Sequence, residues 1–182
     1  MRPYLTAFFW GFAEATFFFF IPDIYLTRLA IYNRYQAFLS CLIAAVSACM
    51  GGIVMYCWGA VNGSQALTFL TYIPGIFPKL ILEVQRTSLQ HPFVALFTAP
   101  VYGIPYKIYA VTLGTEKVRL LIFIFVSFFA RLLRFTFITG AASVLVAVMR
   151  KYTSTRIIAF AHIIIWWIVY SVYFSSQVFK YY

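Results

Sequence analysis

Residues 118–149 read VRLLIFIFVSFFARLLRFTFITGAASVLVAVM, an apolar run interrupted near its middle by Arg131 and Arg134. About 20 apolar residues suffice to cross a bilayer, so this longer run predicts a transmembrane helix that must tilt or kink, with the kink expected at Thr139-Gly140. An arginine at the centre of such a helix costs about 2.5–3.5 kcal/mol. The two arginines therefore need hydrogen-bond acceptors beside them. Suitable acceptors are carboxylates, backbone carbonyls at a broken helix, or an anionic ligand.

The composition of the whole chain is that of a membrane protein. Of the 182 residues, 64% are hydrophobic and only 10% are charged, whereas soluble domains carry about 25% charged residues. We therefore expect a single all-α integral membrane domain over residues 1–182. The net charge of +10 comes largely from basic residues at the ends of apolar runs. This placement indicates topology signals and contacts with anionic lipid headgroups, and no nucleic-acid partner is expected.

The first apolar segment breaks before it can span the membrane. Leu5 to Ile21 carries Glu14 and stops at Pro22-Asp23, and residues 24–32 are too few to cross alone. This pattern predicts a re-entrant helical hairpin with Pro22 at its tip. Such a tip is allowed only where its backbone is buried in protein or faces a watery cavity.

A second segment, residues 92–114, breaks in the same way. Pro100, Gly103 and Pro105 interrupt it, and Lys107 follows the break closely. We predict a second re-entrant hairpin with the two prolines and the glycine at its tip. Paired interrupted segments in the two halves of a chain are the sequence feature that best indicates a transport site.

The remaining segments complete the predicted architecture. Residues 36–61 and 156–179 are continuous apolar spans, so about three full transmembrane helices are expected. After residue 150 the chain is basic, and Arg150, Lys151 and Arg156 mark a cytoplasmic turn by the positive-inside rule. The C-terminus would then lie on the far side of the membrane.

The connector over residues 64–91 is the only mixed stretch. From Lys79 onward its polar residues fall on one helical face and its apolar residues cover most of the rest. We predict an amphipathic helix that lies in the membrane interface. Glu83 and Arg86 are three residues apart, so they are expected to pair on its wet face.

Five charged residues at membrane depth are the candidate functional residues. Arg131 and Arg134 project from one helix face, and with Lys107 they are expected to bind an anionic substrate such as a phosphate. Glu14 and Asp23 flank the first break, so both can line one cavity, where they would exchange protons or pair with the cations. The alternatives are structural: a buried ion pair between the arginines and these carboxylates, a helix cap by Asp23, or an interfacial anchor by Lys107.

No catalytic or metal site is predicted. Cys41, Cys49 and Cys57 share one apolar segment without a CxxC spacing, and neither His91 nor His162 stands at ligand spacing beside them. The sequence holds no GxSxG, HExxH or phosphate-cradling glycine loop. We therefore expect neither enzymatic activity nor a cofactor.

Five short motifs occur in order between residues 8 and 148. In the first half they are Glu14 before Ile21-Pro22-Asp23, then Ala48-Cys49-Met50-Gly51-Gly52 with Tyr56 and Gly59. In the second half they are Pro105-Tyr106-Lys107-Ile108, Gly114 and Arg131-x-x-Arg134-Phe135. Together these motifs resemble the DedA superfamily, also called the SNARE-associated or VTT-domain family, and the second half resembles its YqaA-like branch.

The resemblance implies both a fold and a function. It implies two re-entrant hairpins that face each other across a bacterial inner membrane. It also implies a flippase- or scramblase-type transporter that moves a phospholipid or polyprenyl phosphate between leaflets, with protons as a further partner. Glu14, Asp23, Lys107, Arg131 and Arg134 match the positions at which the family keeps acidic and basic groups. A homo-oligomer is compatible with the sequence.

A run of small residues supports a different class of function. Ala44, Ala48 and Gly52 repeat every four residues, and small residues at this spacing let another helix approach closely. The alternative to transport is therefore a membrane-embedded structural or assembly factor that acts through helix–helix contacts.

Overall fold

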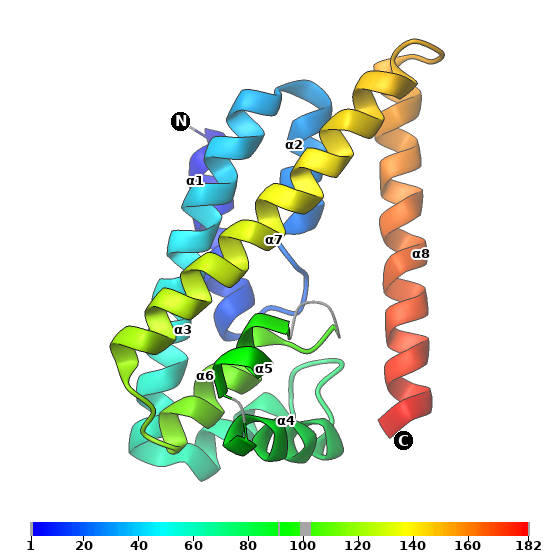
Figure 1. Ribbon diagram of the computed structural model, residues 1–182. Helices are drawn as coiled ribbons and strands as arrows, with labels where there is room; N and C mark the ends of the chain where they lie inside the picture. Colours follow the sequence, from blue (N-terminus) through cyan, green and yellow to red (C-terminus); the bar gives the residue numbers. More distant parts are fainter. Residues whose placement is uncertain (1, 91, 99–102, 182) are drawn as a thin grey trace.

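The computed structural model describes residues 2–90, 92–98 and 103–181, and every regular element in these ranges is an α-helix (Figure 1). Three of the helices are long enough and apolar enough to cross a membrane. The prediction of an all-helical chain with three candidate spans is thereby confirmed. In chain order the elements are α1 (Arg2–Thr16), α2 (Asp23–Tyr32), α3 (Arg34–Leu70), α4 (Pro78–Gln90), α5 (Pro92–Thr98), α6 (Tyr106–Thr115), α7 (Leu120–Met149) and α8 (Thr155–Tyr181).

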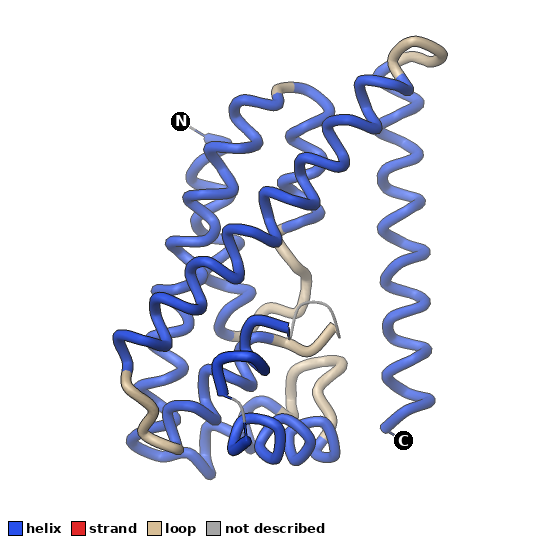
Figure 2. The backbone as a smooth tube through the Cα atoms, in the orientation of Figure 1, coloured by secondary structure: helices blue, strands red, loops and turns tan. Residues whose placement is uncertain are grey.

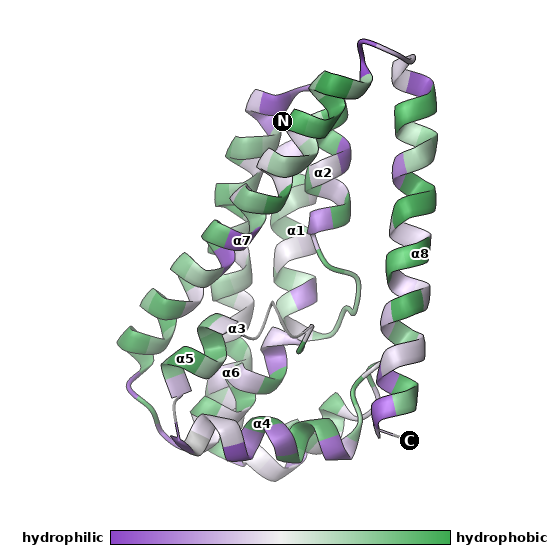
Figure 3. Cartoon of the chain, turned by 45° about the vertical axis from the view of Figure 1, so that its right-hand side comes forward, coloured by the Kyte–Doolittle hydropathy of each residue, from purple (hydrophilic) through white to green (hydrophobic). Residues whose placement is uncertain are grey.

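The three candidate spans are α3, α7 and α8. Hydrophobic residues predominate along α7 and α8, whereas hydrophilic residues gather on α4 and in the loop between α7 and α8 (Figure 3). In α8 only 6% of the most apolar stretch is buried against the rest of the chain. A helix this apolar and this exposed is stable only where lipid covers it. The chain is therefore a multi-pass integral membrane protein.

The helices of the two interrupted segments occupy opposite halves of the molecule. Helices α1 and α2 lie in the half that holds the N-terminus, and α5 and α6 lie in the half that holds α4 and the C-terminus (Figures 1 and 2). The first break is longer than the sequence indicates, because α1 ends at Thr16 and α2 begins at Asp23. Phe17 and Phe18 both donate their backbone N–H to the carbonyl of Ala13, which closes α1 well before Pro22.

The second break lies partly outside the described residues. Pro100 is among the residues that are not described. Gly103 has a positive φ of 68°, a conformation that favours glycine. Pro105 stands at the N-cap of α6, where its missing N–H costs no hydrogen bond.

Helix α3 is the central element, because both interrupted segments pack along it. A side chain at Gly59 would meet the carbonyl of Val111 in α6, and one at Gly114 would meet the carbonyl of Tyr56 in α3. In the other half of α3, a side chain on Gly11 of α1 would meet Ala44. The glycines therefore allow backbone-to-backbone contact on both halves of α3.

One local prediction about the helices proves wrong. Helix α7 runs unbroken from Leu120 to Met149 and is inclined to α8, so the kink expected at Thr139-Gly140 is absent (Figure 1). A lone glycine keeps its backbone N–H, so it does not interrupt the hydrogen-bond ladder as a proline does. In contrast, α3 contains a kink at Asn62, with φ −147° and ψ 77°, and continues to Leu70.

Helix α4 is amphipathic, as the connector sequence predicts. Leu80 and Val84 are fully buried on one face, and Lys79 and Arg86 are exposed. The predicted pairing with Arg86 is wrong. Among the described residues Glu83 pairs with Lys180 of α8, at 3.2 Å.

Candidate functional site

The site is built around Arg131, which lies near the middle of α7. Its Nη1 is 2.5 Å from Oε2 of Glu14 in α1, and its Nη2 is 3.2 Å from Oε1. Each of the two residues is only 4% exposed. The guanidinium also lies over the ring of Tyr106, with Cζ 4.1 Å from the ring centroid. Two hydrogen bonds and an aromatic face thus compensate the burial of this charge.

Arg134 forms a second pair one turn further along α7. Its Nη2 is 2.7 Å from Oδ2 of Asp23, the first residue of α2. The pair is asymmetric, since the side chain of Asp23 is 0% exposed and that of Arg134 is 20% exposed. Oδ1 of Asp23 is buried without a hydrogen-bond partner among the described residues. The N-cap of α2 is Pro22 and Asp23 is the first residue inside the helix, so the geometry favours the ion pair of Asp23 over the helix-cap alternative.

Lys107 connects the two breaks. It lies in the first turn of α6, is 2% exposed, and donates from Nζ to the carbonyl of Phe18 at 2.7 Å. That carbonyl belongs to the first break, where the end of α1 leaves backbone acceptors free. Lys107 therefore lies inside the protein, which disfavours the interfacial-anchor alternative. Its ammonium has a neutral hydrogen-bond acceptor and no carboxylate within ion-pair distance among the described residues.

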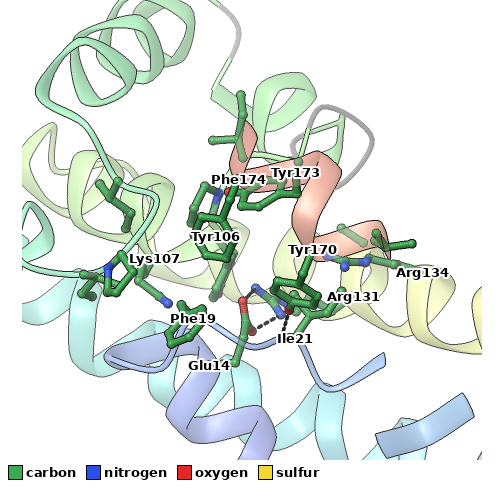
Figure 4. Close-up of a pocket in the computed structure, with 18 of the residues that line it drawn as sticks. Glu14, Phe19, Ile21, Tyr106, Lys107, Arg131, Arg134, Tyr170, Tyr173 and Phe174 are labelled. Atoms are coloured by element: carbon green, nitrogen blue, oxygen red, sulfur yellow. Dashed lines mark hydrogen bonds and ion pairs between the residues drawn. The ribbon is translucent and has the colours of Figure 1, made fainter. Parts of the chain in front are cut away.

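A cavity of about 220 Å³ lies against these charged side chains (Figure 4). Glu14, Lys107, Arg131 and Arg134 line its polar part, and Gly103 and Pro105 of the second break also reach it. Its apolar part is an aromatic wall contributed by α8, which consists of Tyr170, Tyr173 and Phe174. The cavity therefore joins a charged region to an aromatic region.

The charges around the cavity suit an anion. Three cations meet two carboxylates, Glu14 and Asp23, so one positive charge is in excess among the described residues. Arg134 is partly open to the outside, and its planar donors match the oxygens of a phosphate. Comparison with known proteins finds no matching family model and no similar curated protein or solved structure.

The aromatic wall was not anticipated from the sequence. The hydroxyl of Tyr170 accepts a hydrogen bond from the backbone N–H of Ile21 at 2.9 Å, which holds α8 against the first break. Phe174 packs edge-to-face on Phe19, with ring centroids 5.9 Å apart. The available signal was the spacing of Tyr170, Tyr173 and Phe174, which places three aromatic residues on one helix face.

The remaining sequence candidates lie away from the cavity. His162 accepts from Trp166 Nε1 at 3.1 Å and lies 2.9 Å from Thr27 Oγ1, so it joins α8 to α2. His91 is outside the described residues. Among the residues that are described, no three His, Cys, Asp or Glu side chains gather as a metal site. Pro22 begins α2 at its N-cap.

Proposed function

We propose that this chain is a transporter of the DedA type that moves an anionic lipid, a phospholipid or a polyprenyl phosphate, between the leaflets of a bacterial inner membrane. The main support for the proposal is that the buried Arg131 and Lys107 and the partly exposed Arg134 line one cavity, close to both interrupted segments. Interrupted helices with charged residues at mid-depth are the arrangement by which transporters hold a substrate between their halves.

The two interrupted segments act in this proposal as opposed re-entrant hairpins. This arrangement is supported by the positions of the helices, because α1 and α2 occupy one half of the molecule while α5 and α6 occupy the other (Figure 2). Lys107 bonds the carbonyl of Phe18 from one break to the other. An anion bound between the breaks would then be reachable from either leaflet by small movements of one segment against the other.

The cavity accounts for both parts of a lipid. A phosphate would bind Arg134 and Lys107, because the first is partly exposed and the second has no paired carboxylate. The hydrocarbon chain would lie along the aromatic wall of α8 and leave toward the surrounding lipid. Apolar burial contributes roughly 25 cal/mol per Å², so the tail adds affinity that a free phosphate lacks.

Asp23 is the proposed site of proton coupling. It competes with the substrate for Arg134, and its Oδ1 has no hydrogen-bond partner among the described residues. A protonated Asp23 no longer needs Arg134 as a counter-ion, so proton uptake would release that arginine to the phosphate. Binding of the proton and of the anion would then favour each other by the same factor.

The alternative of an assembly factor has less support. The face on which it depends, Ala44, Ala48 and Gly52, is buried. Ala44 packs on Gly11 of α1, and a side chain added to Gly52 would meet Tyr106 of α6. This face therefore makes contacts within the chain and is not free for another protein.

The proposal is tested by lipid transfer in proteoliposomes. Fluorescent phospholipid and polyprenyl phosphate are followed with and without a pH gradient, for the wild type, Arg134→Gln and Asp23→Asn/Arg134→Gln. We expect both variants to lose at least about tenfold in rate, since a charge-assisted hydrogen bond to the phosphate contributes about 1.5–3 kcal/mol. Arg119→Gln, at an exposed position beside α7, is the matched control and should transfer normally. Folded Arg134→Gln protein that transfers at the wild-type rate would contradict the proposal.

A further inference from the structure

A second hollow lies far from the cavity, at the end of the molecule that holds the α2–α3 turn. It consists of two adjoining depressions of about 600 and 410 Å³. Both are lined by Arg34 at the start of α3 and by Ser143 and Ala147 near the end of α7. We call this surface the α3–α7 groove. We propose that it binds an anionic phospholipid, a site separate from the transport cavity and independent of the proposed function.

Three cations surround the upper part of the groove: Arg34, Arg150 and Lys151. Arg150 donates to the carbonyl of Ile31 at the end of α2, which fixes its position. The side chains of Arg34 and Lys151 are exposed, and neither forms an ion pair or hydrogen bond with the described residues. Two unpaired cations beside a fixed arginine are the donor set that a lipid phosphate requires.

No carboxylate of the described residues opposes these cations. Glu14 and Asp23 are bound to arginines of the central site, and Glu83 is bound to Lys180 near the C-terminus. The fourth, Glu116, follows α6 at the opposite end of the molecule (Figure 1). The groove therefore presents a net positive potential, and its nearest counter-charges are those of lipid headgroups.

The rest of this end is also basic. Arg2 is the first residue of α1 and Arg156 lies in the first turn of α8, so both belong to the end that holds the N-terminus and the α7–α8 loop (Figure 1). By the positive-inside rule this is the cytoplasmic end. The cytoplasmic leaflet carries the anionic lipids, and each Lys or Arg near it adds about 1 kcal/mol of attraction.

Below the cations the groove becomes apolar and suits an acyl chain. Phe38 and Val144 line it and are 40% and 67% exposed. Gly140 leaves its floor open, because among the described residues a side chain there would meet only Phe38, at 3.8 Å. Tyr35, also in the lining, is 75% exposed at the cation level, which is typical of tyrosines at a membrane boundary. A second copy of the chain is a poorer occupant, since like charges would face each other across a symmetric contact.

The test is native mass spectrometry of the full chain titrated with phosphatidylglycerol and with phosphatidylcholine. We expect the wild type to bind phosphatidylglycerol more tightly. Arg34→Gln/Lys151→Gln should weaken that binding at least about tenfold, because two headgroup cations are lost. Lys79→Gln/Arg119→Gln removes the same charge from the opposite end and should bind like the wild type. None of these substitutions touches the central cavity, so any lipid bound there contributes equally to the wild type and to both double variants.

A groove-filling variant provides a second measurement. Ala147 is exposed and lines both depressions, so Ala147→Phe should fold and should block the acyl chain. We expect it to weaken phosphatidylglycerol binding at least about fivefold with the cations intact. The inference is overturned if either groove variant binds phosphatidylglycerol as the wild type does, or if the opposite-end control loses as much. It is equally overturned if Ala147→Phe only converts a dimer to a monomer.

Discussion

Arg131 and Glu14 form a two-bond ion pair, at 2.5 and 3.2 Å, although 117 residues separate them in the chain. The pair joins α7 to α1 and is almost completely buried. Burying two charges costs several kcal/mol for each ion, and replacement of such pairs by apolar residues is often neutral or stabilising. A contribution to stability therefore does not explain why this ion pair is present. Its position beside the cavity indicates a functional role instead.

This reasoning predicts different results for single and double substitutions. Glu14→Gln leaves a buried guanidinium unpaired and should cost about 3–5 kcal/mol, as removal of one partner of a buried pair does. Glu14→Met/Arg131→Met removes both charges, so it should recover most of the stability and yet transfer no lipid. The measurements are thermal unfolding of the purified protein and transfer in proteoliposomes. A double variant that is stable and transfers lipid normally would show that the pair is structural only.

The close contact between α3 and α6 predicts a strong glycine effect. A side chain on Gly114 would overlap the carbonyl of Tyr56 and lie 3.1 Å from the backbone nitrogen of Ala60. Gly114→Ala should therefore destabilise the protein by about 1–3 kcal/mol, the usual cost of overpacking. Gly140→Ala is the control, because its new methyl group would lie 3.8 Å from Phe38. It should be neutral, or stabilising by up to about 1 kcal/mol through helix propensity.

Thermal unfolding in one detergent compares the two glycine variants directly. Equal losses of stability in both would contradict the close contact described between α3 and α6.

Much of the helical framework could be predicted from the sequence. Long apolar runs predict α3, α7 and α8, because a run of about 20 apolar residues is long enough to cross a membrane as a helix. Proline and glycine indicate the two breaks, and charge at membrane depth marks Glu14, Asp23, Lys107, Arg131 and Arg134. These signals are local, so they can be recognised in a single amino-acid sequence.

The pairings could not be predicted, since they depend on how distant segments pack. The sequence leaves open which carboxylate meets which arginine, and it indicates a pairing of Glu83 with Arg86, whereas Glu83 contacts Lys180, 97 residues away. The aromatic wall of α8 could not be predicted for the same reason. An aromatic residue on an apolar helix can face either the lipid or the protein interior, and the sequence does not distinguish the two. The early end of α1 depends on Phe17 and Phe18 sharing one carbonyl, which carries no sequence signature.

The hydrogen bond from Ile21 to Tyr170 predicts how α8 is held against the cavity. Tyr170→Phe removes the acceptor of the Ile21 N–H and should cost about 1–3 kcal/mol, the penalty for an unsatisfied donor. Tyr173→Phe deletes a hydroxyl from the same wall that makes no hydrogen bond with the described residues, so it should be close to neutral. Thermal unfolding and hydrogen exchange of the Ile21 amide report the difference. Protection of that amide in Tyr170→Phe equal to the wild type would contradict this attachment.

The C-terminal end of α8 is predicted to respond to pH through Glu83. A hydrogen bond from Tyr181 at 2.6 Å, and the charge of Lys180, hold the pKa of this carboxyl below its ordinary value of 4.5. A lowered folded-state pKa contributes stability that is present above the unfolded value and lost as pH falls through the folded one. The attachment of α8 to α4 should therefore weaken only below about pH 4.5. Hydrogen exchange over residues 175–181, corrected for its intrinsic pH dependence, should rise there in the wild type. In Glu83→Gln, which cannot titrate, the same segment should exchange equally fast above and below that pH, and a rise of the wild-type size in this variant would assign the response to another group.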